Sequence, residues 1–547
     1  MTSERLPLRP SGAGRSWRAG LAVKAAVALA LIALADRLFF AHRPGATVGI
    51  FALIWLAGLC LTRPGLLREA RAVVAMSAAA LLAVAMVDRP SVLLWGLYAL
   101  ALAVAVLSAR VARGETVWRW VQRLVVHGVV SAFGPLMDLV RRSQIRAKRR
   151  LARAGTLMRV VALVAVPLFG GLAFLGLFAA ANPLISDALA RLRPPALSPE
   201  TVVRVIFWGL VGVAVWSSLR PRWRRKLLPS LPVDERPLPG VSTASVTLSL
   251  VVFNLLFALQ NGLDIAFLWS GAPLPEGVTL ADYAHRGAYP LILTALLAGA
   301  FVLTALRPGS ETATRPWVRV LVMVWVAQNM LLVASSLLRT FDYVEVFSLT
   351  RFRLAAMIWM VLVAVGLLLI CWRLIRNRSA DWLVKANLAT ALGVLAAVGI
   401  VNLGPATAAW NVRHAAQIDG DGAGLDLCYL DRLGPAALVS LAELERATPP
   451  SVFRTRVASV RWRAQQTTME RQAHWRGWTW RDARRLAKAQ SLVGMERPDI
   501  GPLPRACDGL PVKLNPPPIT DAPPTAVHEG PPVITPAPAP LTSNTGH

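Results

Sequence analysis

Apolar runs long enough to cross a lipid bilayer recur along most of the chain, and short polar segments separate them. A membrane-spanning helix needs about 20 predominantly apolar residues. Eleven runs meet or approach this length, and we predict a spanning helix for each: Gly20–Phe40, Thr47–Thr62, Ala70–Val87, Ser91–Ala109, Leu157–Ala181, Thr201–Leu219, Thr243–Trp269, Ala288–Leu306, Trp317–Leu338, Leu354–Ile375 and Lys385–Leu403.

The arginines and lysines between these runs fall mostly on alternate sides. They are dense in the segments 63–71, 110–153, 220–226, 307–315 and 373–378. The intervening connections carry fewer arginines, namely Arg43, Arg89, Arg191, Arg193, Arg286, Arg351 and Arg353. Because Lys and Arg in short loops stay in the cytoplasm, this asymmetry predicts a cytoplasmic N-terminus and a C-terminus outside. Such a protein belongs in a cell membrane, and the resemblance described below indicates a bacterial inner membrane.

The polar segments complete a predicted all-α architecture with six parts. A basic cytoplasmic N-terminus (1–19) precedes four spans (20–110), and seven more spans (157–403) follow a basic cytoplasmic segment (111–156). That segment places Trp118, Val121 and Val125 at helical spacing, which fits an amphipathic helix on the inner membrane surface or one packed on the bundle. Residues 404–495 predict a small extracytoplasmic helical module, and the Pro-rich stretch 496–547 predicts a disordered tail.

Within the module we expect helices near Ala406–Gln417, Pro435–Ala447, Val452–Trp475 and Trp480–Leu492. Four tryptophans lie among arginines in this module: Trp462, Trp475, Trp478 and Trp480. They could hold a helix at the outer membrane interface, or they could fill an ordinary small helical core.

The composition indicates which kinds of molecule the protein can bind. Of the 547 residues 55% are hydrophobic and only 16% are charged, against roughly 25% charged in a typical globular chain. The net charge of +29 lies in the loops between spans, where topology explains it, so we expect no nucleic-acid partner. The basic cytoplasmic face should instead attract the anionic lipids of the bilayer.

The chain has four cysteines, and none forms a CxxC pair or a cluster with histidine, so no metal site is expected. Cys428 and Cys507 are the two that fall outside the predicted spans. If the C-terminal region is extracytoplasmic, both lie in an oxidising compartment, and they are candidates for a disulfide. No nucleotide-binding or protease motif occurs in a suitable context, and no cofactor is predicted.

Several motifs resemble a bacterial family of multi-pass membrane proteins, the domain of unknown function 4173. They are the stretches Phe253–Asp264, Leu268–Gly287, Arg339–Tyr343, Ser348–Arg353, Leu425–Pro435 and Trp475–Arg481. The resemblance covers roughly residues 155–495 and implies a polytopic helical membrane protein. That family carries no agreed activity, so the resemblance leaves the function open.

Two groups of residues could carry a function. The first lies in two predicted spans: Asn254, Gln260 and Asp264 belong to the seventh, and Arg339 ends the ninth. An ionised aspartate is costly in lipid, so Asp264 should face other helices and pair with Arg339. This group is either a polar cavity that binds a solute or headgroup, or interhelical bonding that holds the bundle together.

The second group lies in two predicted outer connections: Asp282, Tyr283, His285, Arg286, Tyr343, Glu345, Arg351 and Arg353. Carboxylates and arginines on one membrane face could bind a phosphorylated lipid or perform acid–base chemistry, or they could form a solvated rim of ion pairs. Three functions follow: an envelope binding or signalling scaffold with a protein or lipid-headgroup partner, a transporter or channel, or an intramembrane enzyme acting on lipid-linked substrates.

Overall fold

The structure is a computed structural model that describes residues 20–109, 111, 114–135, 138, 198–220, 242–269, 297, 315–419 and 424–512. Within these residues the regular secondary structure is helical, and isolated bridge residues occur at Ala415 and between Arg505 and Pro511. Six described helices are long and apolar enough to span a membrane: α3 (Ala70–Asp88), α9 (Pro199–Leu219), α10 (Thr243–Asp264), α13 (Pro316–Phe347), α14 (Arg351–Ile375) and α15 (Ala380–Val401). The predicted fold class, an all-α polytopic membrane protein, is confirmed.

Three further helices coincide with predicted runs: α1 (Leu21–Phe39), α2 (Thr47–Thr62) and α4 (Val92–Ser108). Helices α2 and α4 are apolar but shorter than the six, and α1 carries three charged residues. Helix α10 continues into one π-helical turn, Ile265–Trp269. The predicted runs Leu157–Ala181 and Ala288–Leu306 lie outside the described residues, except for residue 297.

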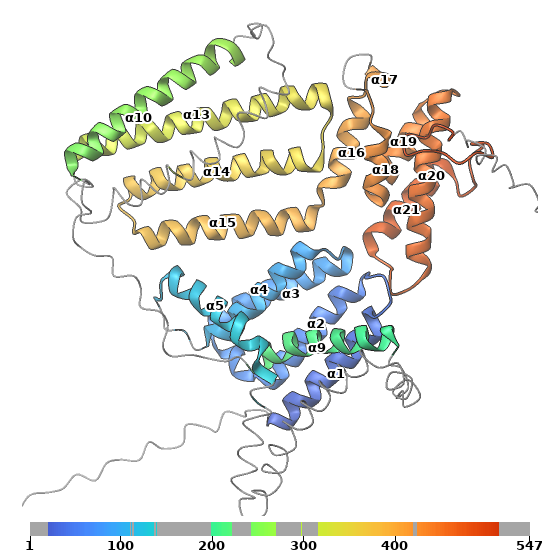
Figure 1. Cartoon of the computed structure of the whole chain (residues 1–547), viewed down its shortest axis with the longest axis horizontal. Coiled ribbons are helices and arrows are strands. Elements are labelled where there is room, and N and C mark those ends of the chain that lie inside the picture. Colours follow the sequence, from blue (N-terminus) through green and yellow to red (C-terminus); the bar gives the residue numbers. More distant parts are fainter. Residues whose placement is uncertain are drawn as a thin grey trace, which may run out of the picture.

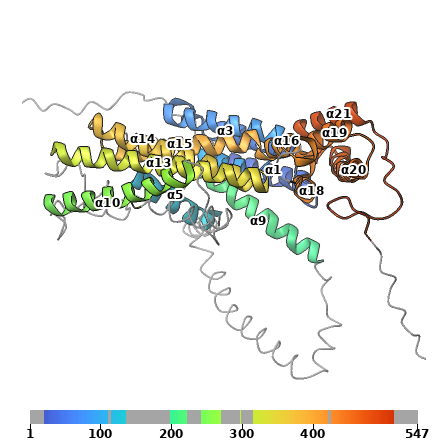
Figure 2. The same cartoon turned by 90° about the horizontal axis from the view of Figure 1, so that it is seen from above.

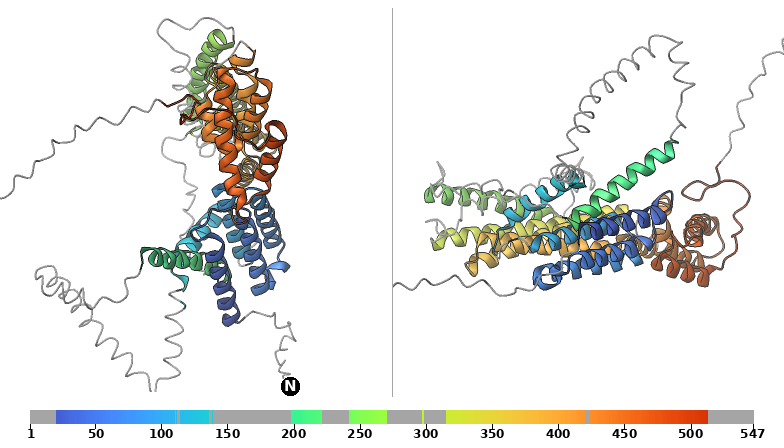
Figure 3. Two further views of the ribbon diagram at one scale, coloured as in Figure 1. Left: turned by 90° about the vertical axis from the view of Figure 1, so that its right-hand side faces the viewer. Right: turned by 90° about the horizontal axis from the view of Figure 1, so that it is seen from below.

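The helices form a flattened row. Helices α10, α13, α14 and α15 lie side by side in chain order, and α15 contacts α4, which packs against α3 (Figure 1). Seen from above, the row is thin (Figure 2). Residues 403–512, which we call the C-terminal module, gather at one end of the row and face the viewer in the left view of Figure 3. We call that end of the spans the module end and the opposite end the arginine end.

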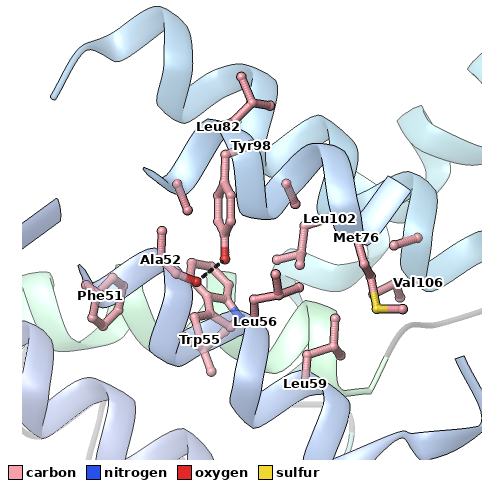
Figure 4. Close-up of a cluster of buried hydrophobic side chains, with 14 of the residues drawn as sticks. Phe51, Ala52, Trp55, Leu56, Leu59, Met76, Leu82, Tyr98, Leu102 and Val106 are labelled. Carbon is pink, nitrogen blue, oxygen red and sulfur yellow. Dashed lines mark hydrogen bonds between the residues drawn. The ribbon is translucent and has the colours of Figure 1, made fainter. Parts of the chain in front are cut away.

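The core of the first spans is built around close helix contacts. Tyr98 is fully buried, and its hydroxyl donates to the carbonyl oxygen of Ala52 at 2.8 Å (Figure 4). The Trp55 indole donates to the Ser218 hydroxyl at 2.9 Å, which joins α2 to α9. A Cβ atom on Gly49 would lie 2.4 Å from the backbone of α3, so only glycine allows α2 and α3 to approach this closely.

Arginines at the arginine end also cap helices. Arg63 donates to the carbonyl oxygens of Ser218 at 3.3 Å and Val106 at 3.4 Å, and Arg71 donates to that of Val111 at 2.8 Å. The last carbonyls of a helix lack partners within it and carry the negative end of its dipole. Cations that the sequence assigns to the cytoplasm therefore also tie neighbouring helix ends together.

Helix α5 (Val117–Ala132) is the amphipathic helix expected in the segment 111–156. It contacts α9, and its first backbone amide donates to the Asp381 carboxylate at 3.0 Å. Its polar residues His127 and Ser131 are buried, whereas four of its apolar residues are exposed: Trp118, Val121, Val125 and Val129. The side of the helix that packs on the bundle thus contains His127 and Ser131, and an apolar stripe faces outward.

The C-terminal module has six described helices: α16 (Leu403–Arg413), α17 (Ala416–Asp419), α18 (Leu427–Leu433), α19 (Leu438–Ala447), α20 (Val452–Ala473) and α21 (Trp480–Val493). Its centre holds a charged cluster. Arg461 is 1% exposed and donates to both oxygens of Glu445, at 2.7 and 3.0 Å, and to Gln465 at 2.8 Å. This arginine, which precedes Trp462 in the chain, joins α20 to α19.

The segment 496–512 differs from the prediction, which placed it in a disordered tail. Arg463 donates to the carbonyl oxygens of Arg505 and Ala506, each at 2.9 Å, and Arg456 donates to that of Asp508 at 3.0 Å. These bonds and a disulfide fasten the segment to α20 and α18. The attachment of this segment cannot be predicted from its composition, because the groups that the arginines bind are backbone carbonyls, which any residue supplies. Residues 513–547 lie outside the described residues.

Candidate functional site

A polar seam runs between α10 and α13, and it contains the first group of predicted residues. The Gln328 amide donates to Asn254 Oδ1 at 2.8 Å, and the Asn254 amide donates to the carbonyl oxygen of Leu321 at 3.1 Å. Two turns after Asn254 on α10, the Asn261 amide donates to the Gln328 carbonyl oxygen at 3.2 Å. Each of these bonds links the two helices, so the seam holds α10 against α13.

The seam ends in a buried ion pair at the module end. Asp264 is 1% exposed, and one of its carboxylate oxygens accepts from the Arg339 guanidinium and from the Gln260 amide, the latter at 3.0 Å. Trp269 in the π-helical turn donates to Ser335 at 3.2 Å close by. The structure therefore places Asp264 and Arg339 together, between the helices rather than toward lipid.

Three acceptor oxygens of the seam are buried without a hydrogen-bond partner among the described residues. They are Asp264 Oδ2, Asn261 Oδ1 and Gln328 Oε1. A buried acceptor without a donor costs roughly 1–3 kcal/mol, so such atoms mark places where a proton, water or ligand would be stabilised.

The connection between α13 and α14 binds the C-terminal module. The Asn411 side chain in α16 accepts from the Leu349 amide at 2.7 Å and donates to the Leu349 carbonyl oxygen at 3.0 Å. The Tyr429 hydroxyl in α18 accepts from the Arg351 amide at 2.8 Å and lies 3.1 Å from the Thr407 hydroxyl. One side chain from each of two module helices thus fixes this connection through its backbone.

The predicted residues of this connection have different surroundings. Arg353 donates to the carbonyl oxygens of Phe347 and Ser348 and stacks over the Tyr343 ring at 4.4 Å, so it caps the end of α13. Glu345 is exposed. The other four predicted residues of the outer connections, Asp282, Tyr283, His285 and Arg286, lie outside the described residues.

The module is also fastened to the first spans. The Ala46 amide donates to the carbonyl oxygen of Trp478 at 2.7 Å. A Cβ atom on Gly45 would lie 2.4 to 2.6 Å from the backbone of residues 476–478, so glycine is required for this contact. Arg481 binds the Asp88 carboxylate, with its Nε 2.7 Å away, and donates to the carbonyl oxygen of Val401 at 3.2 Å.

A disulfide joins Cys428 of α18 to Cys507, with 4.7 Å between the two Cα atoms. Cys60 of α2 and Cys371 of α14 are free thiols. Within the described residues no group of His, Cys, Asp and Glu could hold a metal ion.

Comparison with known families gives one match, to a family model described as Domain of unknown function (DUF4153), over residues 75–444. The chain belongs to this family. The match spans 370 of the 547 residues and is to a different family from the one that the motifs resemble, although both are uncharacterised. It begins earlier than the expected 155 and ends before 495. No curated protein and no solved structure matches the chain.

The DUF4153 match includes the seam, the Asp264–Arg339 pair and the residues of α16 and α18 that bind the α13–α14 connection, whereas α20 and α21 follow it. It includes Arg204 but leaves out Asp36, its partner in a second ion pair that the sequence analysis did not predict. Arg204 of α9 binds both oxygens of Asp36 in α1, at 2.8 and 2.6 Å, and the Trp208 indole donates to Asp36 at 2.9 Å. Asp36 is the single acid in the first apolar run, a signal that it needed a partner.

Proposed function

We propose that this protein is a scaffold of the bacterial inner membrane that holds its C-terminal module on the extracytoplasmic side, where the module docks a partner of the cell envelope. The observation that carries the proposal is the fastening of the module. It is bound to the connection after α1, to the end of α3, to the α13–α14 connection and to the end of α15. Rigidly held surfaces of this kind are where binding residues concentrate.

The orientation is supported by two independent features. Each described connection that contacts the module is one that the arginine pattern assigns to the outside. The module also contains the Cys428–Cys507 disulfide, and such bonds persist in oxidising compartments. An extracytoplasmic module explains both features, and the cytoplasm then contains the arginine end.

A transporter is the second candidate, and the buried acceptors Asp264 Oδ2, Asn261 Oδ1 and Gln328 Oε1 favour it. Buried polar groups within membrane-spanning helices are typical of ion or substrate pathways. The scaffold takes precedence because the amides of Asn254, Asn261 and Gln328 already bond across α10 and α13, which gives the seam a structural role of its own.

Variants of the two regions separate the candidates in a strain that lacks the gene and shows an envelope defect. Gly45→Ala forces a methyl group against the backbone of the module, so we expect it to abolish most of the complementation while the protein stays in the membrane. Asn254→Leu with Gln328→Leu removes a bonded pair together, and we expect near-normal complementation.

Gly96→Ala is the matched control, because a Cβ atom at Gly96 meets no atom within 4 Å. Membrane abundance and protease sensitivity of the module are measured for each variant. If the Asn254/Gln328 variant loses activity while Gly45→Ala retains it, the transporter replaces the scaffold.

A further inference from the structure

Helix α21 presents three arginines to the ends of the spans. Arg481, Arg484 and Arg485 share one face of the helix by their spacing. Arg481 binds the carboxylate of Asp88, with its Nε 2.7 Å away, and Arg484 approaches the same carboxylate to 3.4 Å. A single aspartate at the end of α3 thus accepts from two arginines of the module.

Two further arginines of the bundle lie at the same place, and we call the five together the arginine junction. Arg89 directly follows Asp88 at the end of α3, and the side chain of Arg351, the first residue of α14, lies beside Gly404, three residues after Val401. The charges that act on Arg89 come from Arg481, Arg485, Arg351 and, in the opposite sense, Asp482. Burial first, and then the charge of Arg481, hold the pKa of the Arg89 guanidinium below its ordinary value.

The carboxylates of the junction are already engaged. Asp88 serves two arginines of α21, and Asp482 accepts from Arg485 at 2.9 Å. The side chains of Arg89 and Arg351 make no hydrogen bond or ion pair within the part of the chain that the structure describes. Five arginines face two aspartates, which leaves three positive charges to be balanced by an anion. Planar guanidinium groups are suited to bidentate binding of phosphate.

The position of the junction indicates where that anion comes from. Asp88 and Val401 end α3 and α15, so the junction lies where two spans leave the bilayer. Beside it Trp475 and Trp480 are 63% and 56% exposed, and each lies under an arginine of the module. Exposed tryptophan with arginine is typical of the membrane interface, where lipid headgroups lie.

We propose that the arginine junction binds the phosphate of an anionic lipid headgroup in the leaflet at the module end, with Arg89, Arg351 and Arg485 as donors. The bound phosphate bridges the bundle and the module. It balances positive charge of the arginines that Asp88 and Asp482 do not neutralise. The proposal depends on the junction alone and holds whether or not the module docks an envelope protein.

The test uses the full chain in a phosphate-free detergent and follows its thermal unfolding. We expect phosphatidylglycerol to raise the unfolding temperature, whereas diacylglycerol of the same acyl chains, which lacks the phosphate, leaves it unchanged. Arg89→Gln with Arg485→Gln should weaken the apparent affinity for phosphatidylglycerol at least about tenfold, because each lost donor removes a charge-assisted hydrogen bond. Both substitutions spare the Arg481–Asp88 contact.

The matched control is Arg432→Gln with Arg446→Gln, which removes the same charge from exposed positions of α18 and α19 and should bind lipid as the unmodified chain does. If the glutamine variant fails to fold, Arg89→Lys with Arg485→Lys keeps the charge and should show a smaller loss of affinity. Equal stabilisation of the junction variants and the unmodified chain would overturn the site. Stabilisation by soluble glycerol phosphate to the same extent would overturn the lipid as its source.

Discussion

At the scale of single residues, the Asp264–Arg339 pair shows how burial fixes a partner. Taking a carboxylate out of water requires a compensating charge, and in a bundle that charge must come from a neighbouring helix. Asp264 ends α10, and Arg339 lies in the last turns of α13, so both reach the same depth. The partner could therefore be predicted from topology alone.

Breaking the pair should destabilise the protein. Asp264→Asn or Arg339→Gln alone leaves an uncompensated buried group, which costs about 3–5 kcal/mol, whereas the double variant should recover part of the loss. Unfolding of the purified protein in detergent measures the effect. Lys385→Gln is the control, because the Lys385–Asp381 pair is half-exposed and contributes only about 0.3–0.5 kcal/mol. Strictly additive losses in the double variant would contradict the pairing.

Other residues show what the sequence does not reveal. Asp36 and Arg204 lie 168 positions apart, and only the packing of α1 against α9 brings them together. Arg353, a candidate binding residue, instead donates to the carbonyls at the end of α13. Residue type indicates that such a side chain needs a partner, but the partner is fixed by the fold.

At the scale of elements, apolar periodicity predicts the spans well because lipid demands a continuous apolar stretch. Short helices are harder to predict from the sequence. Helix α18 has seven residues, follows the capping Asp426 and ends before Gly434, which has a positive φ of 54°. Its buried Leu427, Leu430 and Leu433 share a face, so capping residues with three leucines were the available signal.

The docking of α5 should respond to pH. Burial, and to a smaller extent the charge of Arg63, hold the pKa of His127 below its ordinary value. A histidine with a lowered pKa stabilises the folded state above about pH 6.5, its unfolded value, and this stability is lost as the pH falls. We expect hydrogen exchange in α5 to increase between pH 7.5 and 5.5 relative to that in α3 of the same sample. His127→Gln should remove the difference, and an unchanged acid response in that variant would exclude His127 as its origin.

At the scale of the whole molecule, the fold class follows from the sequence, but the lateral order of the helices does not. Loop charges report which side of a membrane a connection lies on, and they are silent about which helix is its neighbour. The contact of α15 with α4 joins segments nearly 300 residues apart through apolar surfaces that resemble every other span. Such order is set by shape and by small residues such as Gly399, where a Cβ atom would lie 2.7 Å from Leu94.

The module end and the arginine end of the spans are predicted to lie in different compartments. Among the described residues, the connections and helix ends that bind the module are all ones that the arginine pattern assigns to the outside, so the compartment of the module fixes the orientation of the spans. A fluorescent reporter that folds only in the cytoplasm should be bright when fused after Gly114 and dark after Met495, and a periplasm-dependent phosphatase should show the reverse. Alkylation without reduction should label Cys60 and Cys371 and leave Cys428 and Cys507 in one linked peptide. A bright fusion after Met495 together with free thiols at both positions would place the module in the cytoplasm, and the proposed scaffold would have to be abandoned.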